Sequence, residues 1–378
     1  MIPRQLEPVI KGRLGTGKAI IVTGPRQTGK TTLLRKIADE LGGYLLLDGD
    51  DLSVKSNLEA ANTEILQQII GNNNVVFIDE AQRIRNIGLI LKIIIDRIKP
   101  DILLVSGSSS LELANEINEP LTGRKWEYML YPVSWQELQD FKGYLASEQQ
   151  LEQRLIYGSY PEILNNPGEE QIILNQLTSS YLYKDLLSYK GIKKPEILEK
   201  LLRALALQVG REVSYSELSG LVQVDKNTIQ SYIDLLEKAF VIFRLQPLSR
   251  NIRNEISSSR KIYFFDNGVR NSLISNFNQL HMRTDTGLLW ENFLISERRK
   301  FLEYNQLFCN TYFWRTSYQQ EIDYIEESGG LFNAFEFKWN PGKSARFSGS
   351  FLGAYKVGTT LTVNRDNFRN FLINPKDD

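Results

Sequence analysis

The sequence is poor in the residues that cross-link chains and ligate soft metals. Among its 378 residues are one cysteine, Cys309, and one histidine, His281. A single cysteine excludes an internal disulfide and a cysteine zinc cluster. A single histidine makes histidine-based catalysis a poor explanation for any activity of the chain.

Long apolar runs are missing as well. None approaches the ~18 residues of a membrane span, and the longest candidate, residues 87–95, is interrupted by Lys92. The N-terminal residues MIPRQLEP lack the apolar core of a secretion signal. We therefore expect a protein of the cytoplasm without membrane contact.

Neither sign of charge dominates, because Lys plus Arg and Asp plus Glu each total 45. The whole chain thus gives no sign of affinity for nucleic acid. A local excess lies between Arg244 and Lys261, where five basic residues stand against one acid. This segment could contact phosphates, or it could be a solvated loop that is balanced elsewhere. The length predicts two or three domains.

The pattern Gly-x-x-x-x-Gly-Lys, typical of phosphate-binding loops, occurs twice near the start. The first copy, residues 12–18, precedes an apolar run and is followed by Ala19, which has no hydroxyl for magnesium. The second copy, residues 24–30, follows the apolar run 19–22 and opens a helical pattern. We assign ATP with Mg²⁺ to the second copy. The residues expected to contact the nucleotide are Gly24, Pro25, Arg26, Gln27, Thr28, Gly29, Lys30, Thr31 and Thr32.

In this arrangement the loop amides would surround a β-phosphate and the helix N-terminus would add positive potential. Lys30 would reach the outer phosphates and Thr31 would ligate magnesium. Downstream, strand-like and helical segments alternate, which predicts a parallel sheet covered by helices. The expected segments are strands at 44–47, 75–78 and 102–105 and helices at 59–70 and 89–98.

Two acids follow the expected strand at 75–78. Ligands bind at the carboxyl ends of the strands in such sheets, so we expect Asp79 to hold magnesium through water and Glu80 to orient or deprotonate the attacking water. A solvated turn is the simpler alternative. The Asn-Lys-x-Asp signature of many GTPases is absent from the sequence, which favours ATP. The acid pair favours water as the nucleophile over the bound acceptor of a small-molecule kinase.

The segments VVFIDEAQRI and ILLVSGSSS resemble AAA-type P-loop ATPases. The resemblance places a serine that senses the γ-phosphate at Ser106 or Ser108, where a turn is the alternative. It also places Arg124, in LTGRKWEYM, where an arginine reaches phosphate in its own or a neighbouring subunit. Such an arginine can change the rate about 10³-fold to 10⁵-fold, although an ordinary surface arginine is an equal alternative. An arginine supplied in trans would need a homo-oligomer.

Residues 195–265 have the pattern of a winged helix. Helices are expected at 197–210, 215–222 and 226–239, and strands at 241–245 and 261–265. The side chains expected to pack inward are Leu218, Leu221, Ile229, Ile233, Leu235 and Leu236. Those left outward, where readers of the DNA major groove carry their contacts, are Lys226, Asn227, Gln230 and Ser231. The basic segment 244–261 would be the wing. Packing between domains is the alternative role.

The C-terminal part carries acids on an expected series of strands. The expected elements are helix 287–304, strands 311–315, 321–326 and 331–339, helix 345–355 and strand 359–363. Because side chains alternate along a strand, Glu336 and Lys338 share one face while Phe335 and Phe337 pack on the other. Two carboxylates and a lysine on one face can hold a divalent metal and activate water for phosphodiester cleavage.

This order resembles the PD-(D/E)xK nuclease fold. The resemblance assigns Asp323, Glu336 and Lys338 to the motif and Glu291 to the helix acid, so that Glu291, Asp323 and Glu336 would hold metal. Ile322 stands where the motif has proline. A degenerate nuclease fold that only binds is an equal alternative.

Nearly the whole chain resembles a large family of predicted bacterial and archaeal ATPases, on further segments such as YGSYPEIL, SSYLYKDLL and KIYFFDNGVRN. The fold expected is an α/β P-loop NTPase parallel sheet, then a winged helix and an α/β restriction-endonuclease-like domain. The expected boundaries are 1–140 for the AAA-type domain, 141–192 for a helical lid or linker, 193–278 for the winged helix and 279–378 for the nuclease-like domain. Two functions stay open: ATP hydrolysis coupled to a DNA-binding, nuclease-like region, or an ATP-dependent switch that binds a protein partner and has an inactive C-terminal site.

Overall fold

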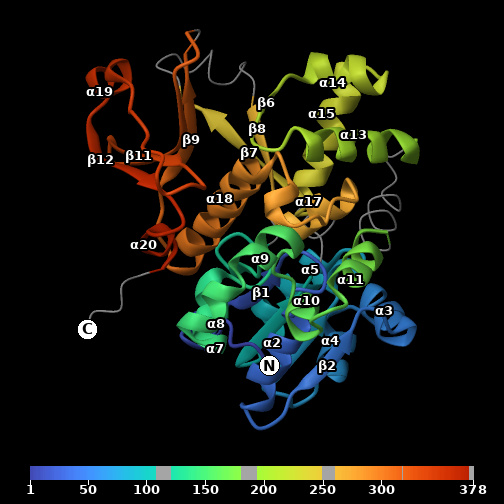
Figure 1. Ribbon diagram of the computed structural model, residues 1–378. Helices are drawn as coiled ribbons and strands as arrows, with labels where there is room; N and C mark the ends of the chain where they lie inside the picture. The colour runs from blue at the N-terminus through green and yellow to red at the C-terminus, as the bar shows by residue number, and fades with distance from the viewer. Residues whose placement is uncertain (108–120, 180–193, 249–259, 317, 374–378) are drawn as a thin grey trace. The chain divides into compact units, whose positions relative to one another are not determined.

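The structure is a computed structural model, and it describes the chain apart from residues 108–120, 180–193, 249–259, 317 and 374–378 (Figure 1). Ser108, most of the expected wing and most of SSYLYKDLL lie outside the described residues. The chain forms two compact units, Met1–Val133 with Lys238–Phe240, and Ser134–Glu237 with Val241–Asp378. The four expected domain ranges remain predictions.

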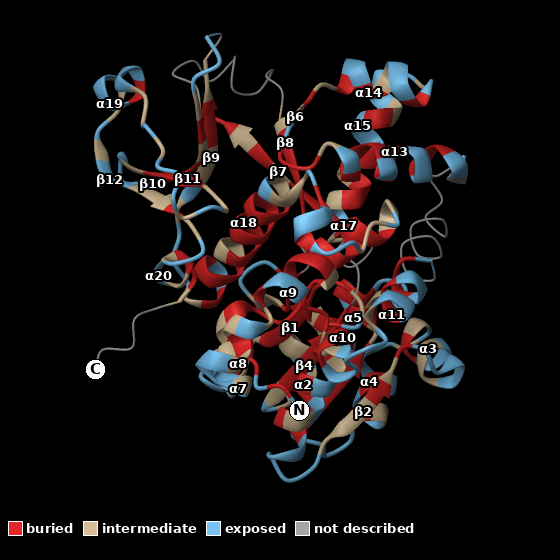
Figure 2. Cartoon of the chain, in the orientation of Figure 1, coloured by how far each residue is buried: buried red, intermediate tan, exposed pale blue. Residues whose placement is uncertain are grey.

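The N-terminal unit contains a parallel sheet of five strands in the order β2-β3-β4-β1-β5. The strands are β1 Ala19–Thr23, β2 Leu45–Asp48, β3 Val75–Asp79, β4 Ile102–Ser106 and β5 Lys125–Met129. All neighbouring pairs run parallel, which confirms the expected parallel α/β sheet. Every residue of β1 and β3 is buried, and Figure 2 shows the sheet as the buried centre of this unit. Burial on both faces is why these strands are mostly apolar.

Helices pack against this sheet. They are α1 Leu6–Lys11, α2 Lys30–Asp39, α3 Leu52–Glu59, α4 Thr63–Ile70 and α5 Ile87–Ile93, which continues as a π-helix over Ile94–Ile98. The single helix expected at 59–70 is wrong at its start, because Asn62 accepts a hydrogen bond from the Ile65 amide at 2.9 Å and begins a new helix there.

The C-terminal unit begins with short helices. They are α7 Trp135–Lys142, α8 Tyr144–Gln149, α9 Leu151–Tyr157, α10 Pro161–Asn165 and α11 Glu170–Leu177. The helices expected at 197–210, 215–222 and 226–239 follow as α13 Pro195–Leu207, α14 Tyr215–Val222 and α15 Lys226–Lys238, and the winged helix that they would form stays a prediction. Five of the six residues expected to pack inward are buried, but Leu221 is 61% exposed. Leu221 is therefore a correction: it follows the apolar spacing of α14 yet lies on the solvent side of this short helix.

A mixed sheet of seven strands, in the order β12-β11-β10-β9-β7-β8-β6, organises the rest of this unit. The strands are β6 Glu212–Val213, β7 Ile242–Pro247, β8 Arg260–Phe264, β9 Asn310–Arg315, β10 Glu321–Ser328, β11 Leu331–Phe337 and β12 Val357–Val363. The helices are α17 Asn267–Leu273, α18 Thr286–Tyr304, α19 Gly349–Ala354 and α20 Phe368–Leu372. Residues expected in two separate domains share this sheet, because β7 pairs in parallel with β9 through Gln246 with Tyr312 and Pro247 with Phe313.

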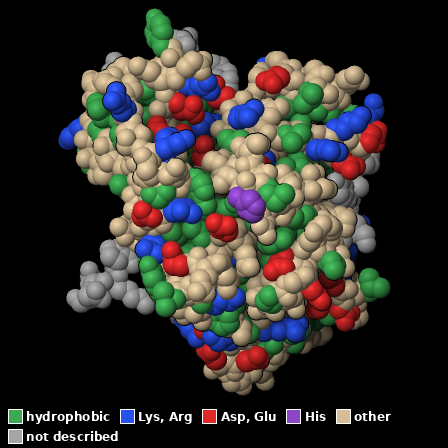
Figure 3. Space-filling view, viewed as in Figure 1, with side chains coloured by type: hydrophobic (Ala, Val, Ile, Leu, Met, Phe, Trp, Pro, Cys, Tyr) green, Lys and Arg blue, Asp and Glu red, His purple; other side chains and the backbone are tan. Residues whose placement is uncertain are grey.

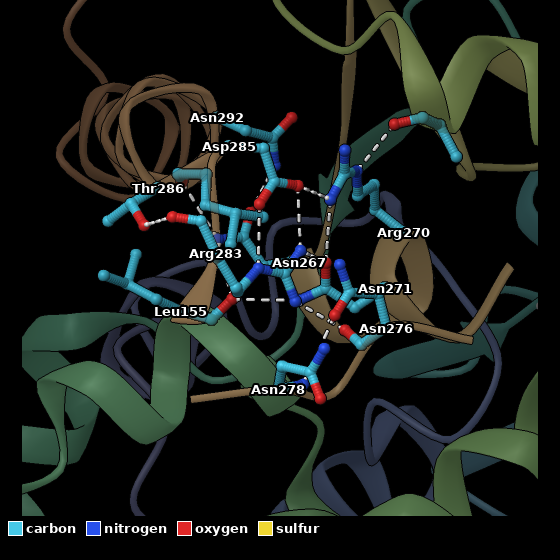
Figure 4. A network of polar contacts seen from close by, with 12 residues as sticks. Leu155, Asn267, Arg270, Asn271, Asn276, Asn278, Arg283, Asp285, Thr286 and Asn292 are labelled. Atoms are coloured by element: carbon cyan, nitrogen blue, oxygen red, sulfur yellow. Dashed lines mark hydrogen bonds and ion pairs between the residues drawn. The ribbon is translucent and has the colours of Figure 1, made fainter. Parts of the chain in front are cut away.

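A buried polar network surrounds α17 and explains much of KIYFFDNGVRN (Figure 4). Arg270 donates to the Ala206 carbonyl at 2.6 Å and to Asp285 at 2.6 Å. Arg283 donates to Asp285 at 2.8 Å and to the Asn271 side chain at 3.0 Å. Buried polar groups are costly unless they are hydrogen-bonded. The side chains of this segment therefore supply hydrogen-bond partners to backbone carbonyls and counterions to charged groups inside the unit.

The surface agrees with the composition. On the face seen in Figure 3, basic and acidic side chains are interspersed, as expected of a chain with equal numbers of each. Within the described residues, none of the helices has the length and apolar character that a membrane crossing requires.

Candidate functional site

The loop of the second Gly-x-x-x-x-Gly-Lys copy joins β1 to α2. Gly24 has φ 139°, and a Cβ there would lie 2.4 Å from the Leu130 carbonyl oxygen, so that only glycine fits. Gly29 has φ 92° and begins α2 without a side-chain cap. The first amides of a helix have no partner within the helix and favour an anion. The loop therefore has the strand-loop-helix placement that the sequence predicts.

The lysine of this loop is buried. Lys30 is 5% exposed, and its Nζ donates to the carbonyl oxygens of Gly24 at 3.0 Å and Pro25 at 2.7 Å. Burial lowers the pKa of Lys30 to about 8, although the nearby Glu80 carboxylate opposes the change. Thr28 stabilises the loop from within, since its hydroxyl donates to the Pro25 carbonyl at 2.9 Å.

Polar groups from the start of α2 and from the ends of β3 and β4 meet next to this loop. The Thr31 hydroxyl donates to Asp79 Oδ1 at 2.9 Å, at the end of β3. Ser106, at the end of β4, also donates to Asp79 Oδ1, and its hydroxyl oxygen accepts from the Glu80 amide at 3.2 Å. A hydroxyl and a carboxylate are ligands suited to magnesium, so the residues fit the expected ion. Within the described residues, Ser106 is a serine that the structure brings to the acids, while Ser108 lies outside those residues.

Glu80 has an unusual backbone conformation. Its φ of 48° lies in the left-handed region, which is uncommon for residues other than glycine. Such outliers concentrate at functional sites. The Glu80 carboxylate accepts a hydrogen bond from Gln82 Nε2 at 2.5 Å, which orients it.

Arg124 lies at the other end of the sheet. Its carbonyl accepts from the Ala19 amide at 3.0 Å, at the start of β1, whereas the loop follows the end of β1. The four steps between the five residues of β1, at about 3.3 Å each, separate those ends by roughly 13 Å. Arg124 Nε instead donates to Asp96 at 2.8 Å. This geometry disfavours a reach to phosphate within one subunit, and a role toward a neighbouring subunit stays a prediction.

The first loop copy has a different environment. Lys18 Nζ lies 4.5 Å and Arg13 Cζ 4.3 Å from the centre of the Trp126 ring. Trp126 donates to the Thr16 hydroxyl at 3.1 Å. These contacts tie the first copy to β5 at the amino end of β1.

Arg4 is a contributor that the sequence pattern does not reveal. Its guanidinium donates to the Thr28 carbonyl at 2.6 Å and to the Tyr131 carbonyl at 2.5 Å, and the residue is 8% exposed. It therefore holds the outside of the loop against the segment that follows β5. No local motif marks it, because its partners are 24 and 127 residues away.

In the C-terminal unit the expected acid motif comes together. Lys338 Nζ lies 2.8 Å from Glu336 Oε2 and 3.8 Å from Asp323 Oδ2. On the other face, the ring centres of Phe335 and Phe337 lie 4.8 Å and 5.7 Å from the ring centre of Phe371. The expected alternation is confirmed. Burial and the neighbouring Asp323 carboxylate raise the pKa of Glu336.

A second lysine, which the motif does not include, enters the same cluster. Lys261 Nζ lies 3.0 Å from Glu291 Oε1 and 2.6 Å from Glu321 Oε1. The Tyr263 hydroxyl donates to Glu291 at 2.6 Å. Burial opposes a charge on Lys261, yet the Glu291, Asp323 and Glu321 carboxylates raise its pKa. Burial raises the pKa of Glu291.

This arrangement does not fit a divalent metal. Lysine ammonium groups lie between the acids, and throughout the part of the chain that the structure describes no three His, Cys, Asp or Glu side chains are placed to hold a metal ion. The expected assignment of metal to Glu291, Asp323 and Glu336 therefore lacks support from the geometry.

A cavity of about 640 Å³ opens elsewhere in this unit, between α18 and strands β7, β9 and β10. Its lining includes Phe243, Arg299, Cys309 and Tyr324. None of the residues expected to bind ATP or a metal ion lines it, although Arg244 of the basic segment does. Burial raises the pKa of Cys309 to about 11, so this thiol is not activated as a nucleophile.

Comparison with known families agrees with the N-terminal site. Residues 16–139 match the family described as AAA domain. Residues 148–280 and 286–375 match two families described as Domain of unknown function, DUF8612 and DUF4143. Residues 16–139 are thus similar to an AAA domain, and the parallel sheet with a glycine-rich loop after β1 agrees with that match.

Relatives extend over most of the chain. The chain is 27% identical over 334 residues to the uncharacterized protein Rv2008c of Mycobacterium tuberculosis, covering 87% of this chain and 72% of that protein. It is 24% identical over 341 residues to the uncharacterized protein MJ1544 of Methanocaldococcus jannaschii, covering 84% and 74%. The solved Walker-type ATPase PABY2304 of Pyrococcus abyssi matches with a TM-score of 0.51 and 16% identity, covering 72% of this chain and 96% of that one. That likeness concerns the fold alone.

Proposed function

We propose that the chain binds and hydrolyses ATP as an AAA-type ATPase. The observation that carries this proposal is the meeting of polar groups beside the loop. Thr31, at the start of α2, contacts Asp79 at 2.9 Å, and the Glu80 amide contacts Ser106 at 3.2 Å, between the ends of β3 and β4. Lys30 lies within electrostatic reach of both acids. Bound Mg²⁺ would neutralise phosphate charge there. The backbone amides of Gly24 and residues 26–32 donate to the phosphates, and Pro25, which has no amide hydrogen, contributes only its shape to the loop.

Each side chain has a distinct role. Lys30 offers its ammonium to the outer phosphates once it leaves the Gly24 and Pro25 carbonyls, and Thr31 and Asp79 hold the ion. Glu80 orients the attacking water and accepts its proton. Ser106 fixes both acids, because it contacts the Asp79 carboxylate and the Glu80 amide.

Three variants test this assignment. Lys30→Ala is expected to lose nucleotide binding, measured with a fluorescent ATP analogue, because it removes the buried ammonium. Glu80→Gln is expected to keep binding and lose phosphate release. Lys18→Ala, in the first loop copy, is the matched control and keeps both. Tight binding by Lys30→Ala, or loss of binding in Lys18→Ala, contradicts the loop assignment.

DNA is the proposed partner of the helix-turn-helix. The first turns of α15 expose Lys226, Asn227, Gln230 and Ser231, and Asp225 caps this helix by accepting from the Thr228 amide at 3.0 Å. An exposed polar helix start is the part of such motifs that enters the major groove.

Fluorescence anisotropy with duplex DNA at several salt concentrations measures this contact. Lys226→Ala is expected to weaken binding and to reduce the salt slope by about one. Lys200→Ala, which removes an exposed lysine of α13, is the control. The ATPase rate with and without DNA reports coupling. If both variants and the wild type bind DNA equally well, α15 does not contact DNA, and α14 and α15 serve in packing instead.

For the C-terminal acids we propose binding without cleavage, as in the ATP-dependent switch that engages a protein partner. The support is the lysine-filled geometry of the cluster. Supercoiled, linear and single-stranded DNA are incubated with protein and Mg²⁺ or Mn²⁺, and no strand is expected to be cut. Cleavage by wild type that a folded Asp323→Ala variant lacks would restore the nuclease role.

A further inference from the structure

The acid cluster of the C-terminal unit has an unusual source of positive charge. Lys261 comes from β8, next to the helix-turn-helix, and is 2% exposed. Its partners come from elsewhere in the fold: Glu291 from α18 and Glu321 from the start of β10. Three distant segments therefore converge on one ammonium group.

The contacts account for the charge of this lysine. Its Nζ lies 3.0 Å and 2.6 Å from the two carboxylates, and 5.5 Å from the centre of the Phe313 ring. A buried ion is costly unless it is paired and hydrogen-bonded. Glu291 has a further donor in the Tyr263 hydroxyl at 2.6 Å. The ammonium group thus lies within ion-pair distance of one carboxylate from a helix and one from a strand.

Lys338 makes a different contribution. It is 31% exposed, and it contacts Glu336 and Asp323 at the rim of the cluster. Lys261 is fully enclosed and contacts the other two acids. The two lysines divide the four carboxylates between them.

We propose that Lys261 is the resident cation of this cluster. Its ammonium holds Glu291 and Glu321 in the way that a divalent metal would hold them, it keeps such metals out, and it ties β8 to α18 and β10. This inference rests on the proposed non-cleaving role and deepens it. Its test measures metal binding and uses no cleavage assay, so the inference and the proposed role can each fail while the other stands.

The test replaces Lys261 by methionine, which keeps the length and removes the charge. Removing one partner of a buried ion pair is expected to lower the melting temperature of the C-terminal unit by roughly 10 °C. Added Mn²⁺ should then bind with saturation, seen by loss of its free electron paramagnetic resonance signal, and should recover part of the lost melting temperature. Wild type should show neither effect.

Lys300→Met is the matched control. Lys300 is also 2% exposed and pairs with Glu297 at 2.6 Å within α18. Its replacement should lower the melting temperature without creating a Mn²⁺ site. If Lys261→Met does not fold, the double variant Lys261→Met with Glu321→Gln removes charge of both signs, and it should fold and bind Mn²⁺ more tightly than wild type.

Two results overturn the proposal. One is saturable Mn²⁺ binding by wild type that Asp323→Ala removes. The other is a folded Lys261→Met or double variant whose Mn²⁺ binding and melting response equal those of wild type. Such a result would show that Lys261 does not decide whether the acids accept a metal.

Discussion

The burial of Lys30 predicts that the affinity for ATP falls as the pH rises above about 8. Burial lowers the pKa of Lys30 to about 8 in the nucleotide-free protein. A bound triphosphate would bring several negative charges to this ammonium and raise its pKa again. Below pH 8 the lysine is protonated with or without nucleotide, so the affinity is flat. Above pH 8 binding must take up a proton, so the affinity falls as the pH rises.

The size of the effect follows from the same value. At pH 9, one unit above the free pKa, the affinity should be about tenfold lower than at pH 7.5, which corresponds to about 1.4 kcal/mol. At pH 8.5 roughly three quarters of a proton should be taken up for each nucleotide bound. Phosphate groups are fully ionised in this range and do not contribute.

Titration calorimetry of the Glu80→Gln variant, which should not turn ATP over, measures both quantities in buffers with different heats of ionisation. Lys30→Arg is the control, because arginine stays protonated and removes the pH dependence. An affinity that is constant from pH 7.5 to 9.5, or a release of protons, would refute the reasoning that a buried, partly neutral lysine receives the phosphates.

Four further predictions follow from single contacts. Lys30→Met should raise the unfolding free energy of the nucleotide-free protein by about 3 kcal/mol at pH 7, as urea unfolding can measure. Burial lowers the pKa of Lys30 from 10.5 to about 8, so the folded protein bears the cost of a buried charge below pH 8 and is relieved of it as the pH rises above 8. Burial opposes ionisation of Asp285, but the guanidinium groups of Arg283 and Arg270 hold its pKa at about 2 against an ordinary 3.8. Asp285→Asn should therefore lower the free energy of unfolding by about 2 kcal/mol above pH 4, and by progressively less as the pH falls toward 2. Arg4→Met should weaken ATP binding several-fold by freeing the loop, while Arg13→Met does not. Arg124→Ala should slow ATP turnover only under conditions in which mass photometry shows an assembly, and an equal loss in the monomer would contradict a role in trans.

The sequence predicts the N-terminal fold well because its signals are local. Buried parallel strands are short apolar runs, and the loop, the acids and α2 follow them at fixed spacing. The edge strand β5 is not predicted from an apolar run, because its residues are partly exposed and mostly polar or aromatic. Leu221 shows the opposite failure, an apolar residue at core spacing that a short helix leaves in solvent.

The candidate sites divide in the same way. Lys30, Thr31, Asp79 and Ser106 are within or next to recognisable segments and do meet. Lys261 begins the segment KIYFFDNGVRN but belongs to neither the phosphate-loop pattern nor the acid motif. Its partners lie 30 and 60 positions along the chain, so only the folded sheet brings them together. Arg124 shows that a motif position is insufficient without the register, which places it at the amino end of β1.

The pairing of β7 with β9 bears on how this protein can be dissected. A fragment beginning at residue 279 would keep β9 to β12 but lose β7, and β9 would become an open edge with unsatisfied backbone groups. Exposed edges of that kind recruit strands from other molecules. The same cut would remove Lys261 and leave Glu291 and Glu321 without their shared counterion. Truncations meant to isolate the last hundred residues should therefore aggregate, and the shortest well-behaved piece should begin ahead of α13.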